Sequence, residues 1–278
     1  MTPEKLVSQD SDIASFPLIL DLLIEAINDP RSTVDQLVNI VMYDQDLCSR
    51  LIKIVNSPIY NFQEEIDTIE KALNVIGTEQ LLSITLGSTV LSKFDKVPED
   101  LVALKTFWHH GIACGLASKA IAKLKNEKNL DIYYVGGMIH DIGSLVIYNQ
   151  IPEKGKLALV QCNEWGRSLI DAEQDVMGFN HAQVGTALMK KWKLPEWLCQ
   201  AVEFHHNPND TEICQIETAI MHVADTIAEG SFFGSSGQIE SQILDTKAWG
   251  KLNLPNRYLT TIYAELYEGF EEMEKIFS

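Results

Sequence analysis

Apolar residues recur every three to four positions along most of the chain. No other feature of the sequence restricts the possible folds of the chain as strongly as this spacing. Clear runs are Leu18, Leu22, Leu23, Ala26 and Ile27, and then Leu47, Leu51, Ile54 and Val55. An α-helix turns once in about 3.6 residues, so such residues share one face of a helix. Strict alternation of apolar and polar residues, which is typical of strands, is scarce. The sequence therefore predicts an all-α fold of many short helices.

Capping and breaking residues predict where these helices begin and end. Thr33 and Gln36 match a capping box, in which two side chains bind N–H groups of the first turn. Gly77 is expected to close a helix that Asp67 opens, and Thr78 to cap the next one. One expected helix ends near residue 28. The others cover about 33–42, 44–56, 67–77, 78–94, 98–125, 131–149, 152–165, 168–176, 180–192, 195–205, 212–229 and 258–277.

An acidic segment that contains a proline, residues 94–100, separates a first third without histidine from a remainder that holds every histidine. We expect a boundary there. The predicted parts are an N-terminal helical lobe over 1–96, a His-bearing helical lobe over 97–230, and a C-terminal loop and helix over 231–278 that complete the domain.

The charge balance limits the kind of partner. The chain has 22 basic and 39 acidic side chains and a net charge of −17. Such a charge repels a nucleic-acid backbone unless a basic patch is present, and the sequence shows no such patch. We therefore expect no direct nucleic-acid binding, and favour protein partners or a small ligand.

Location is predicted from the absence of targeting signals. No stretch approaches about 18 unbroken apolar residues, and no signal-peptide pattern follows Met1. The five Cys are scattered and contain no Cys-x-x-Cys, so we expect reduced packing residues rather than disulfides or a thiolate metal site. A cytoplasmic protein without membrane contact is expected.

Histidine and aspartate suggest the chemistry. His140 and Asp141 are adjacent, and His109–His110 and His205–His206 form pairs. Any one histidine is more often a packing or surface residue, but the set as a whole favours a metal site. Imidazole and carboxylate suit iron, manganese, nickel or zinc, whereas oxygen ligands alone would indicate magnesium or calcium. We predict a divalent transition metal.

The number of ions stays open between one and two. Neighbouring residues of a continuous helix diverge by about 100°. His140 and Asp141 can therefore share an ion only if it lies between their directions, or if the carboxylate bridges two ions.

A series of motifs in the chain resembles the HDOD domain over about residues 12–230. In the His-bearing part they are Phe107-Trp108-His109-His110, Gly137-Met138-Ile139-His140-Asp141-Ile142-Gly143, Asn180-His181-Ala182-x-x-Gly185, Trp192-x-Leu194-Pro195-x-Trp197, His205-His206 and Ala224-Asp225. In the first third they are Phe16-Pro17, Asn28-Asp29-Pro30, Asp44-Gln45-Asp46-Leu47, Asn56-Ser57-Pro58-Ile59-Tyr60 and Ile69-Glu70-Lys71-Ala72-x-x-x-Ile76-Gly77. HDOD domains are output-domain relatives of the HD metal-dependent phosphohydrolases. The resemblance thus implies an HD-like helical bundle with an additional N-terminal helical lobe.

The resemblance also implies a set of metal ligands. His110, His140, Asp141 and Asp225 match the core ligand positions of the HD superfamily. The related HD-GYP phosphodiesterases add histidines for a binuclear centre, and three residues match these in order and approximate spacing. They are His181, His205 and His206.

Three departures weaken an HD-GYP assignment. Asn207-Pro208-Asn209-Asp210 replaces the Gly-Tyr-Pro segment expected after His206. Ser144 stands where those enzymes carry a lysine, and Thr106 stands where a glutamate would serve a third metal. The metal site can thus be kept while the known chemistry is lost, and no catalytic residue is assigned.

Two functions from different classes follow. The first is a signal-transduction output module that acts on signalling proteins, with the first third as a surface for partners or self-association, or else as a packing lobe. The second is a metal-dependent phosphohydrolase or phosphodiesterase, in which metal-activated water attacks a nucleotide or another phosphoester. The first is favoured, although the ligand set would attract a phosphate-containing small ligand in either case.

Two further histidines are expected to lie outside the ligand set. His109 should point away, because its neighbour His110 takes the face toward the site. His222 lies one turn before Asp225 and is either a supporting hydrogen-bond donor to it or, more often for such a residue, a solvated or core histidine.

Overall fold

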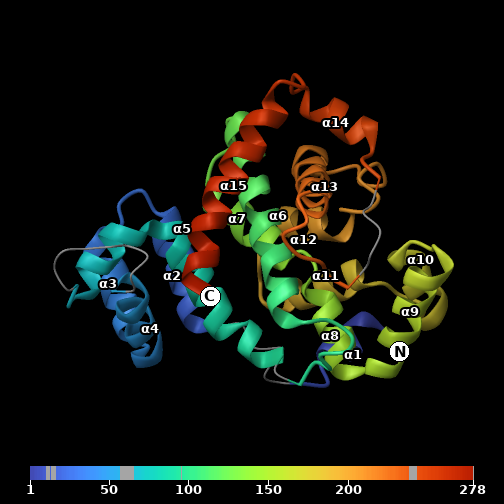
Figure 1. Ribbon diagram of the computed structural model, residues 1–278, viewed down its shortest axis with the longest axis horizontal. Coiled ribbons are helices and arrows are strands. Elements are labelled where there is room, and N and C mark those ends of the chain that lie inside the picture. The colour runs from blue at the N-terminus through green and yellow to red at the C-terminus, as the bar shows by residue number, and fades with distance from the viewer. Residues whose placement is uncertain (11–12, 14–16, 57–65, 95, 238–242, 278) are drawn as a thin grey trace.

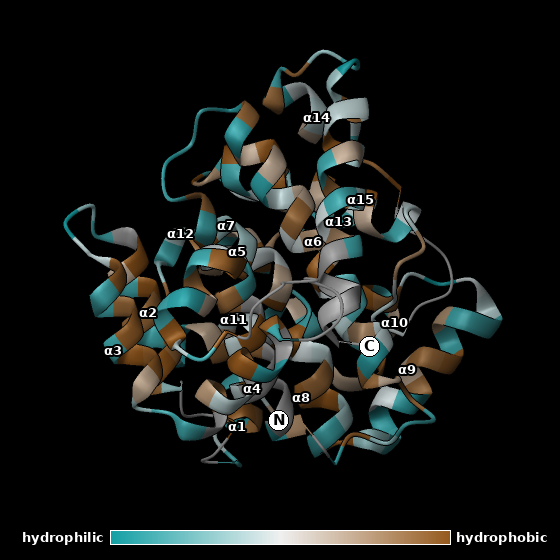
Figure 2. Cartoon of the chain, turned by 60° about the vertical axis from the view of Figure 1, so that its left-hand side comes forward, coloured by the Kyte–Doolittle hydropathy of each residue, from teal (hydrophilic) through white to brown (hydrophobic). Residues whose placement is uncertain are grey.

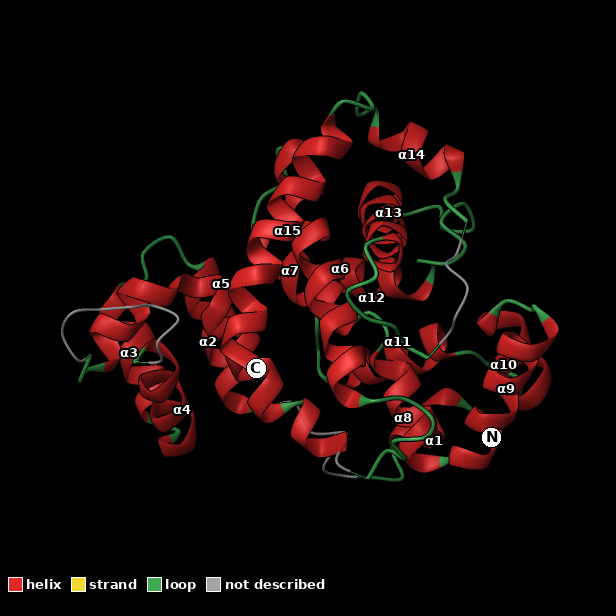
Figure 3. Cartoon of the chain, in the orientation of Figure 1, coloured by secondary structure: helices red, strands yellow, loops and turns green. Residues whose placement is uncertain are grey.

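The computed structural model describes residues 1–10, 13, 17–56, 66–94, 96–237 and 243–277. Within these ranges the chain forms helices joined by loops and turns, without a strand (Figure 3). The all-α prediction is therefore confirmed. The motif residues Phe16 and Ser57–Tyr60 lie outside the described ranges. No helix of the described chain is both long and apolar enough to span a membrane.

The first part of the chain follows its sequence signals closely. Its elements are α1 (Pro3–Val7), α2 (Leu18–Asn28), α3 (Val34–Met42), α4 (Gln45–Val55), α5 (Ile69–Thr89) and a short 3-10 helix, η1 (Leu91–Phe94). Thr33 and Gln36 form the predicted capping box of α3. Gly77 interrupts α5 with a φ of 72°, a left-handed conformation that glycine adopts at little cost. Thr68, rather than Asp67, caps α5.

The elements that follow η1 in the described chain are all α-helices. They are α6 (Leu104–Leu124), α7 (Leu130–Ile139), α8 (Ile142–Gln150), α9 (Pro152–Trp165), α10 (Leu169–Met177), α11 (His181–Lys191), α12 (Glu196–Glu203), α13 (Gln215–Gly230), α14 (Thr246–Leu252) and α15 (Tyr258–Phe277). The helix expected from residue 98 begins only at Leu104, because the carbonyl of Pro98 accepts from Leu101 and Val102 in a preceding turn. The helices α1 and α14 were not expected, since they are too short to show a periodic pattern.

The helices are arranged around α6 and α7 (Figure 1). Helices α13 and α15 pack on α6, while α2 and α5 pack on α7. Helices α2 to α5 lie together at the left of Figure 1, whereas α1 packs against α8 and α11 on the other side. Most helices carry both hydrophobic and hydrophilic residues (Figure 2), and the buried apolar side chains form one connected cluster.

Two glycines bring α6 and α7 close together. A Cβ atom on Gly111 would lie 2.6 Å from the carbonyl oxygen of Met138, and one on Gly137 would lie 2.7 Å from that of Cys114. Any larger residue at either position would force the helices apart. Both glycines are therefore required for the close packing of α6 and α7. Their close approach also sets the distance between His110, on α6, and His140, at the end of α7.

Candidate metal centre

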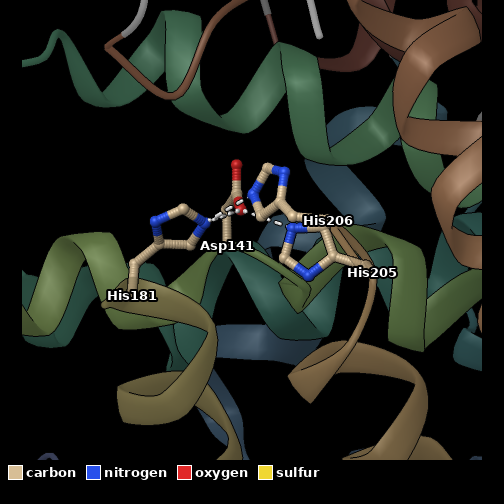
Figure 4. A group of neighbouring side chains, drawn as sticks. All are labelled: Asp141, His181, His205 and His206. Carbon is tan, nitrogen blue, oxygen red and sulfur yellow. Dashed lines mark hydrogen bonds and ion pairs between the residues drawn. The ribbon is translucent and has the colours of Figure 1, made fainter. Parts of the chain in front are cut away.

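The seven predicted ligand residues come from separate elements and meet in the interior. His110 lies on α6, His181 begins α11 and Asp225 lies on α13. His140 and Asp141 lie between α7 and α8, and His205 and His206 follow α12. Their donor atoms form two groups, in each of which all atoms lie within 4.8 Å of one another. One group is Asp141, His181, His205 and His206 (Figure 4), and the other is His110, His140 and Asp225.

His140 and Asp141 occupy a break in the helix that was expected over residues 131–149. Asp141 has φ −93° and ψ 8°, which ends the regular helix, and α8 resumes at Ile142. The expectation of one continuous helix over residues 131–149 was therefore wrong. Nε2 of His140 and Oδ2 of Asp141 lie 3.4 Å apart. The two adjacent side chains thus approach the same point.

The carboxylate of Asp141 lies between the two groups. Its Oδ1 is 3.4 Å from Nε2 of His181 and 3.6 Å from Nε2 of His205. Its Oδ2 is 3.4 Å from Nε2 of His140 and 3.7 Å from Nε2 of His110. Each oxygen thus faces a different pair of imidazoles, which is the arrangement expected of a carboxylate that bridges two ions.

Asp225 completes the second group. Its Oδ1 lies 3.1 Å from Nε2 of His110 and 3.3 Å from Nε2 of His140. Both histidines therefore stand between an oxygen of Asp225 and an oxygen of Asp141. Two imidazoles and two carboxylates around one point form a donor set that suits a divalent transition metal.

Hydrogen bonds fix three imidazole rings with Nε2 pointing inward. Nδ1 lies 2.8 Å from the Gly137 carbonyl in His140 and 2.6 Å from the Val202 carbonyl in His205. A carbonyl oxygen only accepts, so Nδ1 of both rings carries the proton and Nε2 keeps its lone pair. In His181, Nδ1 lies 2.7 Å from Oε2 of Glu173 and is held in the same way. Such partners of the outer nitrogen are typical of metal-binding histidines.

The inward-facing atoms fit a metal better than they fit one another. Nε2 of His110, His140 and His205 and Oδ1 of Asp141 are buried and make no hydrogen bond among the described residues. The imidazole nitrogens lie near carboxylate oxygens, and the Asp141 oxygen lies near imidazole nitrogens, but these contacts do not have the geometry of hydrogen bonds. Buried polar atoms without partners are costly and call for an explanation. One ion in each donor group would supply the missing partners of all four.

Glu173 is a part of this centre that the sequence analysis missed. It lies on α10, is 1% exposed, and accepts from both the backbone N–H and Nδ1 of His181 at 2.7 Å. It therefore holds the imidazole and the first residue of α11 at once. Nothing in the spacing of Glu173 and His181 indicates this contact, because it depends on how α10 and α11 meet.

The charges of the site move the pKa values of its members in opposite directions. Burial lowers the pKa of His181, but the carboxylates of Glu173 and Asp141 outweigh burial and raise it to about 9. Burial also lowers the pKa of His140, yet Asp141 and Asp225 hold it well above the usual value. Burial and the neighbouring His205 and His181 lower the pKa of His206. The donor set thus competes for protons as well as for metal.

His109 and His222 lie outside the donor set, as expected. The ring of His109 packs edge-on against Phe270, with the ring centroids 5.3 Å apart. Nδ1 of His222 lies 2.8 Å from the His205 carbonyl, and its Nε2 accepts from the backbone N–H of Asp245 at 2.8 Å. His222 is therefore a core histidine that fixes the backbone of His205, and its described hydrogen bonds do not include one to Asp225.

The three positions that depart from the HD-GYP pattern are also resolved. Ser144 is fully buried on α8. Thr106 is exposed in the first turn of α6. The segment after His206 forms a turn in which the N–H of Asp210 donates to the carbonyl of Asn207. Ser144 and Thr106 are themselves neither cations nor carboxylates, while in the segment after His206 the carbonyl of Pro208 accepts from the ammonium of Lys251 at 3.0 Å.

Comparisons with known proteins agree with the motifs. The family model of the HDOD domain matches residues 13–208. An uncharacterized protein of Treponema pallidum is 26% identical over 210 residues, which are 70% of this chain and 38% of that protein. The chain therefore spans well under half the length of this relative.

Three solved structures share the fold. An HDOD domain protein of unknown function from Geobacter sulfurreducens has a TM-score of 0.77 at 22% identity, covering 94% of this chain and 92% of its own. A candidate signal transduction protein from Marinobacter aquaeolei has 0.76 at 17%, covering 95% and 60%. A candidate phosphohydrolase from Shewanella amazonensis has 0.71 at 20%, covering 98% and 97%. At these identities the likeness establishes the fold alone.

Proposed function

The chain belongs to the HDOD domain family, and on that premise we propose that it is a signal-transduction output module with a metal centre. It holds one or two divalent transition-metal ions, iron, manganese, nickel or zinc, and acts through contacts with other signalling proteins. The Marinobacter protein of the same fold is itself described as a candidate signal transduction protein.

The observation that carries the metal centre is the position of Asp141. Its two oxygens face two different pairs of buried Nε2 atoms, within 3.4 to 3.7 Å. A second ion is therefore part of the proposal, with Asp141 as the shared ligand. His110, His140 and Asp225 would hold one ion, and the second would be held by the remaining three imidazoles, those of His181, His205 and His206.

A specific observation keeps phosphohydrolase activity as the second candidate. Two divalent ions carry four positive charges, and Asp141 and Asp225 offset two of them, so the centre would attract a phosphate group. Divalent ions in such sites polarise phosphoester oxygens and activate water. The Shewanella protein of this fold is described as a candidate phosphohydrolase. The buried Ser144 argues against the HD-GYP reaction, because a hydroxyl supplies no cation to a phosphate.

Metal analysis of the untagged full chain tests the proposal. The protein is purified without chelator, then reconstituted separately with iron, manganese, nickel and zinc. We expect one to two ions per chain, and a loss of binding in His110→Gln. His109→Gln is the matched control, because its ring packs on Phe270 outside the donor set. Less than about a tenth of an ion per chain with every metal would contradict the proposal.

A further inference from the structure

An apolar groove lies on the face formed by α2 and α3, two helices that stand at the left of Figure 1 and contribute none of the candidate donor atoms. It has a volume of about 820 Å³, and its walls include Leu18 and Leu22 of α2, Ile40 of α3, and Tyr43 in the turn before α4. A second hollow of about 380 Å³ shares Leu22 and Ile40 with it and continues along the same two helices. The two hollows form one groove, which we call the α2–α3 groove.

Large apolar side chains at the α2–α3 groove are exposed to an unusual degree. Leu18 is 70% exposed and Tyr43 is 85% exposed, and Met42 beside Tyr43 is 63% exposed. A single exposed apolar residue is ordinary on a protein surface. Several of them around one groove are typical of a binding surface for a protein.

The charges around the α2–α3 groove have one sign. Helices α2 and α3 contain no Lys, Arg or His, and carry Asp21, Glu25 and Asp35. Asp44 lines the groove. In the turn that joins the helices, the guanidinium of Arg31 pairs with the carboxylate of Asp29 at 3.0 Å. An occupant with basic side chains would therefore be attracted, and an acidic one repelled.

The shape and the charge select among the occupants. An extended peptide usually adds to the edge of a sheet, and the described chain has no strand. A groove between two helices accepts the apolar face of a third helix instead. A second copy of the chain would bring Asp21, Glu25 and Asp44 against their own copies, in a protein with a net charge of −17. A membrane surface with anionic lipids would be repelled in the same way.

We propose that the α2–α3 groove binds a basic amphipathic helix of a partner protein, with its apolar face over Leu22 and Ile40 and its basic edge over Asp21, Glu25 and Asp44. This inference rests on the proposed function, for which it names the contact surface and the chemistry of the partner. Leu18 and Tyr43 line the same hollow at one end of the groove, where α2 begins and α3 ends, and would contact the bound helix there.

Binding of a model helix to the intact protein tests this assignment. The probe is a peptide of about 18 residues, built of leucine and lysine with the leucines at helical spacing. A matched peptide carries glutamate in place of lysine. We expect the lysine peptide to bind with one-to-one stoichiometry in calorimetry, and the glutamate peptide not to bind. Tyr43→Ala and Leu18→Ala should each weaken binding about tenfold or more, the loss expected of a central anchor.

Two control variants separate the groove from general attraction to an acidic protein. Ile213→Ala removes an apolar side chain that is 66% exposed between α12 and α13, and should leave binding unchanged. Asp44→Asn removes a charge from the groove. In the original chain Oδ1 of Asp44 accepts a hydrogen bond from the N–H of Leu47 at 2.9 Å, and the amide oxygen of asparagine can accept the same bond, so α4 stays capped. This variant should weaken binding and reduce its salt dependence.

Three results would overturn the proposal. The first is that the glutamate peptide binds as well as the lysine peptide. The second is that Ile213→Ala weakens binding as much as Tyr43→Ala does. The third is a dimer in sedimentation equilibrium that Tyr43→Ala abolishes, which would assign the groove to a second copy. A chain that holds metal but binds no peptide contradicts this inference alone, whereas one that binds the peptide but no metal contradicts only the metal centre.

Discussion

Oε2 of Glu173 lies 2.7 Å from both the backbone nitrogen and Nδ1 of His181. One buried oxygen thus fixes the ring orientation, the protonated nitrogen and the start of α11. A carboxylate behind a ligand histidine raises the basicity of the nitrogen that faces the metal. Glu173 is therefore a positioning residue of the proposed centre, although it touches no metal itself.

Replacing Glu173 should weaken metal binding without removing a ligand. For Glu173→Ala we expect metal affinity to fall about 10- to 100-fold, the usual effect of losing such a partner. The measurement is a competition titration of the reconstituted protein against a chelator. Glu164→Gln, on α9, is the control and should bind like the original chain. If Glu173→Ala is fully folded and its metal affinity is unchanged, the contact between Glu173 and His181 supports the fold and does not contribute to metal binding.

Removing the shared carboxylate should remove the stabilisation that metal provides. Metal that binds only the native state stabilises it by RT ln(1 + [L]/Kd), about 3 kcal/mol at 100 times Kd. We expect the original chain and His109→Gln to show a clear rise in Tm on adding metal, and Asp141→Asn to show almost none. Comparing the rise within each variant separates metal binding from any change in the metal-free protein. An equal rise in Asp141→Asn would exclude this residue as a ligand.

The stability of the metal-free protein and the stabilisation that metal adds to it should change with pH in opposite directions. The pKa of His181 in the folded protein, about 9, lies above its ordinary value of 6.5 because of Glu173 and Asp141, despite burial. Protonation therefore stabilises the metal-free protein fully below pH 6.5, and this contribution is lost as pH rises through 9. The difference is worth on the order of 3 kcal/mol at most.

Metal binding requires the neutral ring, so the rise in Tm caused by metal should grow over the same pH range. The measurement is thermal unfolding between pH 6.5 and 9, with chelator and with saturating metal. In chelator, the decline should be smaller in His181→Gln and unchanged in His109→Gln. A metal-free Tm that climbs from pH 6.5 to 9 would contradict the raised pKa.

The candidate ligand residues could be named from the sequence, but their arrangement could not. Residue type, order and family resemblance pointed to the seven residues whose donor atoms lie in two groups. The break between α7 and α8 gave no signal, because apolar residues keep their helical spacing across residues 131–149. The position of Asp141 between the two groups gave none either, because it depends on how α6, α11 and the end of α12 pack around it.

The residues that position the donors were harder to predict for a general reason. Glu173 acts across the contact of α10 with α11, and His222 bonds to backbone groups of His205 and Asp245. Such contacts depend on where helices meet, which local spacing does not record. By contrast, the capping box at Thr33 and the break at Gly77 are local, and both were predicted.

Cyclic di-GMP, the substrate expected of HD-GYP enzymes, should not be turned over at an enzymatic rate. The buried Ser144 supplies no cation, and the turn after His206 lacks Gly-Tyr-Pro. We expect turnover below about 1 per second, the low end of ordinary enzymes, with each reconstituted metal form. An active HD-GYP enzyme in the same buffer is the positive control. Faster turnover that Asp141→Asn abolishes would favour the phosphodiesterase.

Metal occupancy should be felt in helices α2 to α5. Helix α7 ends at Ile139, next to His140, and α2 and α5 pack on α7, so the proposed centre is one helix away from the α2–α3 groove. Coupling requires the metal to bind two states of the protein differently. We expect hydrogen exchange to be slower in the metal-loaded full chain than in the metal-free chain. The difference should be seen in α7 and also in α2 and α5, which precede Pro98 in the sequence. The Asp141→Asn variant should show no such difference when metal is added. If protection changes with metal but ends at residue 97, α2 to α5 form a packing lobe that does not receive the state of the centre.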